Sequence, residues 1–147
     1  MNITICGSIA FYGEMLSAKS ELEKASHVVK LPPHEIEDEN GKLIPIKRFY
    51  EIRKTTQTTE GWIWDNKLKA MKLHFDKVAW ADAILVLNYE KNSIKGYVGG
   101  NTLLEMGLAL HLGKPIYMLN KVPEMPYKEE LLGMKPIIIE GDLSKIL

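Results

Sequence analysis

The chain of 147 residues has the length of one average domain, and its 46% hydrophobic and 26% charged residues are ordinary for a globular protein. Nineteen basic and nineteen acidic residues give a formal net charge of zero. This balance argues against a protein that binds nucleic acid or a membrane surface, because such partners require concentrated positive charge. The single cysteine, Cys6, excludes a disulfide framework and a cysteine zinc site and suits a reducing cytoplasm.

The opening residues MNITICGSIAF have no basic, apolar signal-peptide pattern. No apolar run approaches the roughly 18 residues that suggest a membrane-spanning helix. We therefore expect one cytoplasmic domain, 1–147.

Short β-like runs alternate with helical ones along the chain. The first half predicts a strand at 2–6, a helix at 13–25 and a strand at 27–31 that ends at two prolines. Residues 34–60 then break this rhythm with the hairpin-turn dipeptide Asn40-Gly41 and a polar, Thr-rich stretch. Because long connections of this kind are usually functional, we interpret 34–60 as a flap or lid.

The second half resumes the alternation. A helix is predicted over 62–81, with Leu68, Met71, Phe75 and Val78 on one apolar stripe, and Trp64 is interpreted as core at helical spacing from Leu68. The apolar run 83–87 indicates a buried parallel strand. The remaining predicted elements are a Gly-rich loop at 91–100, a helix ending at Gly113, strands at 115–119 and 136–140, and a short helix at 127–132.

This alternation predicts an α/β fold: a doubly wound, parallel five-stranded sheet of order 2-1-3-4-5 with helices on both faces. Ligands of such sheets bind beyond the carboxyl ends of the strands, at the point where the strand order reverses. The loops that begin at Gly7 and Asn88 should therefore share one site.

The first of these loops, CGSIAFYG at 6–13, presents backbone N–H groups and the Ser8 hydroxyl at the start of a helix, as an anion site does. A simple strand-to-helix turn would use the same residues. The spacing differs from the dinucleotide-binding GxGxxG pattern. Cys6 is interpreted as a small buried hydrophobe rather than a nucleophile.

The second loop carries Gly96, Gly99 and Gly100, and either Asn101 or Thr102 is suited to cap the following helix. In one interpretation, Glu105 completes a capping box with Thr102 and turns back toward the helix start. In the other, the same carboxylate lies in the cleft, is kept ionised by the helix dipole in the first turn, and attacks or stabilises an electron-poor sugar carbon. The spacing alone fits both interpretations.

Three segments, CGSI, WADAILVLN and GGNTLLEMGLALHLGKPIYML, resemble the nucleoside 2-deoxyribosyltransferase superfamily, which includes 2′-deoxynucleoside 5′-phosphate N-hydrolases. The resemblance covers most of the chain outside 34–60 and implies a flavodoxin- or Rossmann-like domain. It also implies that Glu105 is the catalytic nucleophile and that the protein is a homo-oligomer.

The chain departs from this family at two positions. Where the family usually has an aspartate in the helix before the third strand, this chain has His74, and the nearby Asp76 points away from the apolar stripe. Histidine handles protons near neutral pH, so His74 is a candidate for assisting the leaving base, or else a core-edge histidine. Where the family often has an acidic or hydroxyl residue before the glutamate, this chain has Gly99, which leaves the substrate class open.

Other side-chain groups give weaker signals. The four histidines lack metal-ligand spacing, so no metal site is expected. Lys47, Arg48, Arg53 and Lys54 form a basic cluster in the flap, either solvated or reaching a substrate phosphate.

The leading hypothesis is cleavage or transfer of the N-glycosidic bond of (2′-deoxy)nucleosides or their 5′-monophosphates through a covalent glycosyl-Glu105 intermediate. This chemistry requires no cofactor. Two alternatives remain: a cytokinin-activating type of phosphoribohydrolase, whose GGxGTxxE motif resembles GGNTLLE, and a nucleotide-sensing module without catalysis. The predicted catalytic residues are Glu105 and His74, and the predicted substrate-binding residues are Gly7, Ser8, Ile9, Asn88, Gly99, Gly100, Asn101 and Thr102.

Overall fold

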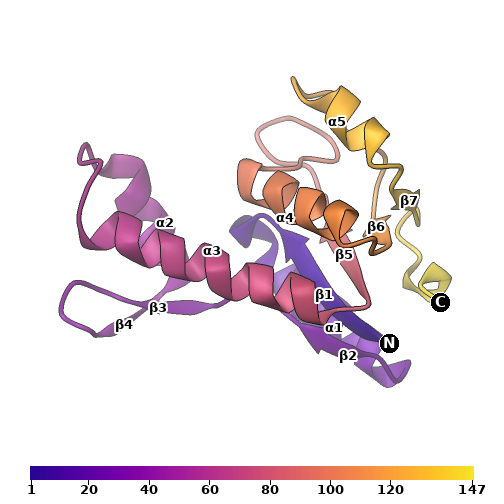
Figure 1. The fold of residues 1–147 in the computed structure, drawn as a ribbon, viewed down its shortest axis with the longest axis horizontal. Coiled ribbons are helices and arrows are strands. Elements are labelled where there is room, and N and C mark those ends of the chain that lie inside the picture. The colour runs from indigo at the N-terminus through magenta and orange to yellow at the C-terminus, as the bar shows by residue number, and fades with distance from the viewer.

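The computed structural model describes residues 1–147. Its centre is a parallel sheet of five strands in the order β2-β1-β5-β6-β7 (Figure 1). The strands are β1 (Asn2–Gly7), β2 (Val28–Lys30), β5 (Ala83–Leu87), β6 (Ile116–Met118) and β7 (Ile137–Ile138). Numbered within this sheet alone, the order is 2-1-3-4-5, and the predicted α/β fold is confirmed.

Five α-helices accompany the sheet, four of them close to their predicted bounds. They are α1 (Tyr12–Lys24), α2 (Ile46–Thr55), α3 (Trp62–Trp80), α4 (Gly100–His111) and α5 (Lys128–Gly133). Short 3-10 turns lie at Ile9–Phe11 and Leu143–Lys145. None of the helices is long and apolar enough to cross a membrane.

Both faces of the sheet are buried, as the continuous apolar run of β5 predicts. Successive side chains of a strand point to opposite faces. Leu85 and Leu87 accordingly join the core under α1 and the C-terminal 3-10 turn, whereas Ile84 and Val86 join the core under α3, α4 and α5. This two-sided packing fixes the loops that follow β1 and β5 at one end of the sheet.

Residues 34–60 form an ordered insertion. The antiparallel strands β3 (Glu35–Glu37) and β4 (Leu43–Pro45) make the predicted hairpin around Asn40-Gly41, and α2 follows directly. This helix was not predicted, although Ile46 and Phe49, three residues apart, are its buried residues. They pack against Ile63 at the start of α3 in a small core of their own. The lid interpretation remains a prediction.

The apolar stripe predicted for α3 is confirmed only in part. Val78 is buried and Met71 and Phe75 are half-buried, but Leu68 is 53% exposed, and the buried positions of the helix are Ile63, Asn66, His74 and Val78. Two of these buried residues are polar, so a search for apolar spacing could not find this face. Trp64, predicted as a core residue, is half-buried and packs against the small core of Ile46, Phe49 and Ile63. Its indole N–H donates to the Thr58 carbonyl at 2.8 Å.

Candidate active site

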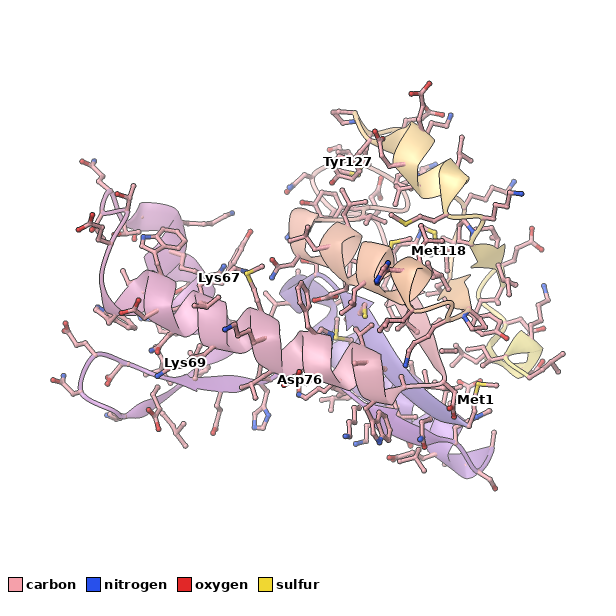
Figure 2. All side chains as sticks on the ribbon, in the orientation of Figure 1. Met1, Lys67, Lys69, Asp76, Met118 and Tyr127 are labelled. Carbon is pink, nitrogen blue, oxygen red and sulfur yellow. The ribbon has the colours of Figure 1, made fainter.

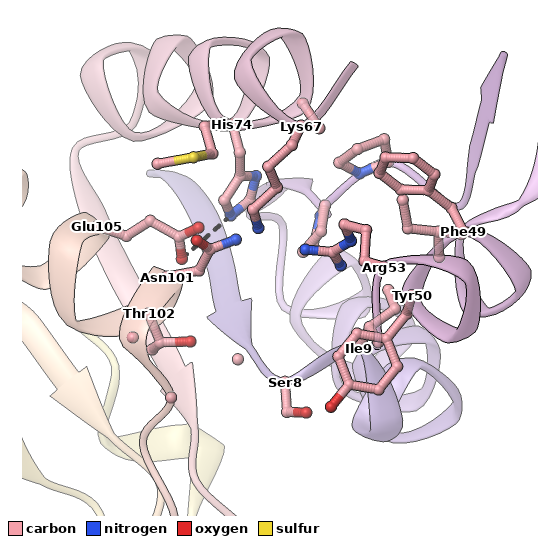
Figure 3. Close-up of a pocket in the computed structure, with 18 of the residues that line it drawn as sticks. Ser8, Ile9, Phe49, Tyr50, Arg53, Lys67, His74, Asn101, Thr102 and Glu105 are labelled. Carbon is pink, nitrogen blue, oxygen red and sulfur yellow. Dashed lines mark ion pairs between the residues drawn. The ribbon is translucent and has the colours of Figure 1, made fainter. Parts of the chain in front are cut away.

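A pocket of about 270 Å³ lies beyond the carboxyl ends of β1 and β5, just below the range of about 300–1,000 Å³ usual for small-molecule sites (Figure 3). The loop after β1, the loop before α4, and helices α2 and α3 supply its walls. Nine of the ten predicted site residues line it: Gly7, Ser8, Ile9, His74, Gly99, Gly100, Asn101, Thr102 and Glu105. The structure thus places the two predicted loops in one site.

The close approach of the β5 backbone requires glycine at Gly7, where β1 ends. A Cβ on Gly7 would lie 2.9 Å from the carbonyl oxygen of Leu87, so any side chain there would force β1 away from β5. Ser8 follows and caps the 3-10 turn, because its hydroxyl accepts a hydrogen bond from the Ala10 N–H at 3.4 Å. The same hydroxyl accepts a 2.7 Å hydrogen bond from the ammonium of Lys91, in the loop after β5.

Helix α4 begins without a side-chain cap. Its N-cap is Gly99, so the prediction that Asn101 or Thr102 caps the helix is wrong. Because α4 begins at Gly100, Thr102 lies within the first turn and Glu105 in the second. Glu105 is 7% exposed and lines the pocket instead of returning to the helix start. The capping-box interpretation of Glu105 is therefore wrong.

Glu105 and His74 face each other across the pocket floor, one from α4 and one from α3 (Figure 3). Nε2 of His74 lies 3.7 Å from Oε2 of Glu105, and the two side chains are 4% and 9% exposed. Neither ring nitrogen of His74 has a hydrogen-bond partner. Burial, with a smaller effect of Lys77, lowers the His74 pKa to about 4, so the imidazole is neutral at pH 7.

The Glu105 carboxyl is strongly perturbed. Burial raises its pKa from 4.5 to about 7, against the opposing effects of a hydrogen bond with Cys6 and of the Lys67 charge. The prediction that the helix dipole keeps Glu105 fully ionised is wrong, because the carboxylate lies beyond the first turn and is desolvated. Cys6 is fully buried, and burial and then Glu105 raise its thiol pKa, which agrees with its interpretation as a buried, unreactive side chain.

Three cationic side chains line the pocket, and the sequence pointed to only one of them. Of the basic cluster in the flap, Arg53 alone reaches the site; Lys67 of α3 and Lys91 were not predicted. Lys67 lies on the same side of α3 as His74, seven residues and about two helical turns away. Figure 2 shows Lys67 and Lys69 projecting from opposite edges of α3. Burial, and then the charge of Arg53, lowers the Lys67 pKa to about 8.

Asn88, the tenth predicted site residue, lies outside the pocket. Its amide N–H₂ donates to the carbonyls of Gly96, Asn120 and Lys121 at 3.0–3.3 Å, and its Oδ1 accepts a 2.8 Å hydrogen bond from the Asn120 N–H. These contacts occupy the side chain, so Asn88 shapes the loop before α4 instead of contacting a ligand.

The fold also brings together three donor atoms that could hold a metal ion. Ligand atoms of Cys6, His74 and Glu105 lie within 4.8 Å of one another, although nothing in their sequence spacing predicts a metal site. The Lys67 ammonium acts on the Glu105 carboxylate, and this positive charge opposes a divalent cation at the same place.

Comparison with known proteins supports the fold. No protein-family model matches the chain, and no curated protein matches it either. Among solved structures, a 2-deoxyribosyltransferase of the psychrotolerant bacterium Bacillus psychrosaccharolyticus aligns with a TM-score of 0.51 and 16% sequence identity, over 81% of this chain and 72% of that one. The chain therefore shares the α/β fold of that 2-deoxyribosyltransferase.

Proposed function

We propose that this protein is an enzyme that cleaves or transfers the N-glycosidic bond of (2′-deoxy)nucleosides or their 5′-monophosphates. The observation that carries the proposal is Glu105, a buried carboxylate on the pocket floor between two glycine-containing loops. The shared fold with a 2-deoxyribosyltransferase, together with the resemblance of the GGNTLLEMG segment, supports the same chemistry.

In this proposal, the ionised Glu105 attacks C1′ of the sugar. The C1′–N bond breaks with its electron pair on the base nitrogen, which takes up a proton from solvent water, and a C1′–O bond forms to the carboxylate. Attack on this ester by water gives hydrolysis, and attack by a second base gives transfer; both restore the original configuration at C1′. Lys67 favours the ionised carboxylate, and the neutral His74 lies beside it, with Nε2 3.7 Å from Oε2 of Glu105.

A sensing module that binds a nucleotide without cleaving it is the second candidate. One observation favours it: with a pKa of about 7, a large share of Glu105 is protonated at neutral pH and cannot attack a sugar carbon. A bound ligand that places charged or polar groups beside Glu105 would change its protonated fraction. A measurement of catalytic activity therefore distinguishes the enzyme from the sensing module.

The test is release of free base. The purified protein is incubated with a panel of ribo- and deoxyribonucleosides and their monophosphates, with and without a second base, and products are separated by chromatography. We expect Glu105→Gln to lose on the order of a thousandfold or more of the activity, because the amide cannot act as an anionic nucleophile. The exposed Glu21→Gln variant is the matched control and should remain fully active.

A slow 2-fluoro nucleoside analogue should leave a sugar adduct on Glu105, detectable by mass spectrometry of the digested protein. An active Glu105→Gln protein would refute the covalent mechanism. Absence of base release from the whole panel, with nucleotide binding retained, would favour the sensing module.

We also propose that the protein forms homo-oligomers. Helices α3 and α4 pack side by side and carry half-exposed leucines that a second copy could cover: Leu68, Leu73, Leu104 and Leu110. Light scattering during size-exclusion chromatography tests this, and a mass of 16.7 kDa, that of one chain, would refute it.

A further inference from the structure

Two cations project into the pocket without an anionic partner. The guanidinium of Arg53 enters from α2 and the ammonium of Lys67 from α3 (Figure 3). Neither takes part in any of the six ion pairs of the chain, and Nε of Arg53 is buried without a hydrogen-bond partner. Both residues are half-buried, and charges withdrawn from water are normally paired, so these two groups lack an anionic partner that a ligand could supply.

Lys91, the third cation of the pocket, differs from this pair. Its ammonium donates to the Ser8 hydroxyl at 2.7 Å and lies over the rings of Tyr50 and Tyr97, 5.4 and 5.2 Å from their centres. The protein itself therefore satisfies Lys91, which joins the loop after β5 to the turn after β1 and to α2. The unsatisfied positive charge belongs to Arg53 and Lys67.

The charge balance of the pocket is positive although the chain as a whole is neutral. The residues that line the pocket include three cationic side chains and one acidic side chain, Glu105; the cations are Arg53, Lys67 and Lys91. With Glu105 ionised and His74 neutral, three positive charges and one negative charge leave a net charge of +2. Arg53 and Lys67 also act on each other, because the charge of Arg53 lowers the pKa of Lys67. An anion between them would reverse this repulsion.

Arg53 is held in an orientation suited to binding an anion. Its guanidinium lies 5.1 Å from the centre of the Phe49 ring and 5.4 Å from that of Tyr50, and both rings come from the same helix. Aromatic rings beside a guanidinium hold its plane while its N–H edge stays free. A planar edge of this kind pairs with two oxygens of a phosphate or carboxylate at once.

We infer that Arg53 and Lys67 form a subsite for a phosphate group, carried by a nucleotide or bound as free phosphate beside the sugar. A phosphomonoester carries a charge of roughly −1.5 to −2 at pH 7, which matches the +2 of the pocket better than a single carboxylate does. The inference deepens the proposed function and rests on it for the sugar-containing ligand. It assigns a substrate-recognition role to the insertion 34–60, because Arg53 comes from α2.

Calorimetric titration tests the subsite without catalysis. The probes are inorganic phosphate, 2-deoxyribose 5-phosphate and 2-deoxyribose, titrated into the unmodified protein and into Arg53→Met and Lys67→Met. We expect both phosphate compounds to bind and each variant to weaken them about tenfold or more, as loss of a hydrogen bond to a charged group does. The matched control is Lys72→Met, which removes an exposed charge from the same helix and should leave binding unchanged.

Competition distinguishes the two sources of phosphate. If inorganic phosphate and 2-deoxyribose 5-phosphate displace each other, the subsite holds the phosphate of a nucleotide; if inorganic phosphate binds together with 2-deoxyribose 5-phosphate, it is a separate ligand. The charge-retaining variants Arg53→Lys and Lys67→Arg should keep part of the binding, which guards against a mere folding defect. Absence of phosphate binding, or binding equally strong in both methionine variants, would overturn the inference. A protein that binds phosphate through Arg53 and Lys67 but releases no base would refute the proposed reaction alone.

Discussion

The buried carboxylate of Glu105 should make the protein less stable as the pH rises. In the unfolded chain this carboxyl ionises near 4.5, whereas burial raises its pKa to about 7 in the folded chain. The folded state therefore holds the proton more tightly. The stabilisation from the protonated form is fully present below pH 4.5 and is lost as the pH rises through about 7. Replacing Glu105 by glutamine removes this dependence, because the amide does not titrate.

The size of this loss of stability follows from the difference between the folded and unfolded pKa values of Glu105. Each pKa unit corresponds to about 1.4 kcal/mol, so the difference between 4.5 and about 7 amounts to roughly 3 kcal/mol once both states are ionised. At pH 8.5 the unmodified protein should carry nearly all of this penalty, and at pH 5 less than about 1 kcal/mol of it. The free energy of unfolding of Glu105→Gln, relative to the unmodified protein, should thus increase by about 2–3 kcal/mol between pH 5 and pH 8.5.

Urea denaturation followed by tryptophan fluorescence at the two pH values measures this difference. Burial, the largest influence on the His74 pKa, is common to both proteins, so its contribution cancels in the comparison. Any constant cost of burying the glutamine amide also cancels, because only the change with pH is used. The exposed Glu21→Gln variant is the control and should show no such change. A stability difference between Glu105→Gln and the unmodified protein that is equal at both pH values would refute the argument from burial.

Three further predictions concern other parts of the molecule. Asn88→Ala should lower the free energy of unfolding by about 2–4 kcal/mol, because it leaves loop carbonyls and the Asn120 N–H without partners; urea denaturation measures this, and an unchanged midpoint would contradict it. His74→Ala should lower turnover beyond its loss of stability and change the shape of the pH–rate profile; a variant with normal turnover and only a lower melting temperature would make His74 structural. Hydrogen exchange in 34–60 should slow when a nucleotide binds, as expected of a lid, and exchange unchanged by every nucleotide tested would count against that role.

The sheet could be predicted from the sequence because its determinants are local. Each strand is a short apolar or β-branched run, and 83–87 is apolar at every position because both of its faces are buried. The alternation with helices predicts a parallel, doubly wound sheet, and the order of the strands is one of those common to such sheets. These rules also located the site at the carboxyl ends of β1 and β5.

The incorrect predictions for α2 and α3 have the same physical cause: the buried residues of these helices do not follow a local apolar pattern. Helix α2 was missed because its buried residues belong to a small separate core, within a segment that is otherwise polar. The buried face of α3 was misassigned because Asn66 and His74 occupy positions where a pattern search expects apolar residues. Asn66 donates its amide N–H to the Glu37 carbonyl of the hairpin, a contact between residues 29 apart that no local spacing reveals.

The interpretation of Glu105 depended on a single backbone detail. Thr102 and Glu105 have the spacing of a capping box, but the motif forms only if Thr102 precedes the helix. Because α4 begins at Gly100, Thr102 is already helical, and the carboxylate is turned toward the pocket. Where a helix begins is the least certain part of any interpretation from sequence.

The polar side chains that line the pocket oppose folding in several independent ways. Glu105 is an acid buried with its pKa raised, His74 is a buried base without hydrogen-bond partners, and Arg53 and Lys67 are half-buried cations that repel each other and take part in no ion pair. Apolar residues in place of the buried Glu105 and His74 would stabilise the same fold, because buried ionisable and unsatisfied polar groups are costly. Departures of this kind from folding rules are expected at functional sites. Their convergence on one pocket, from α2, α3 and α4, indicates that this part of the sequence serves a ligand and not the stability of the fold.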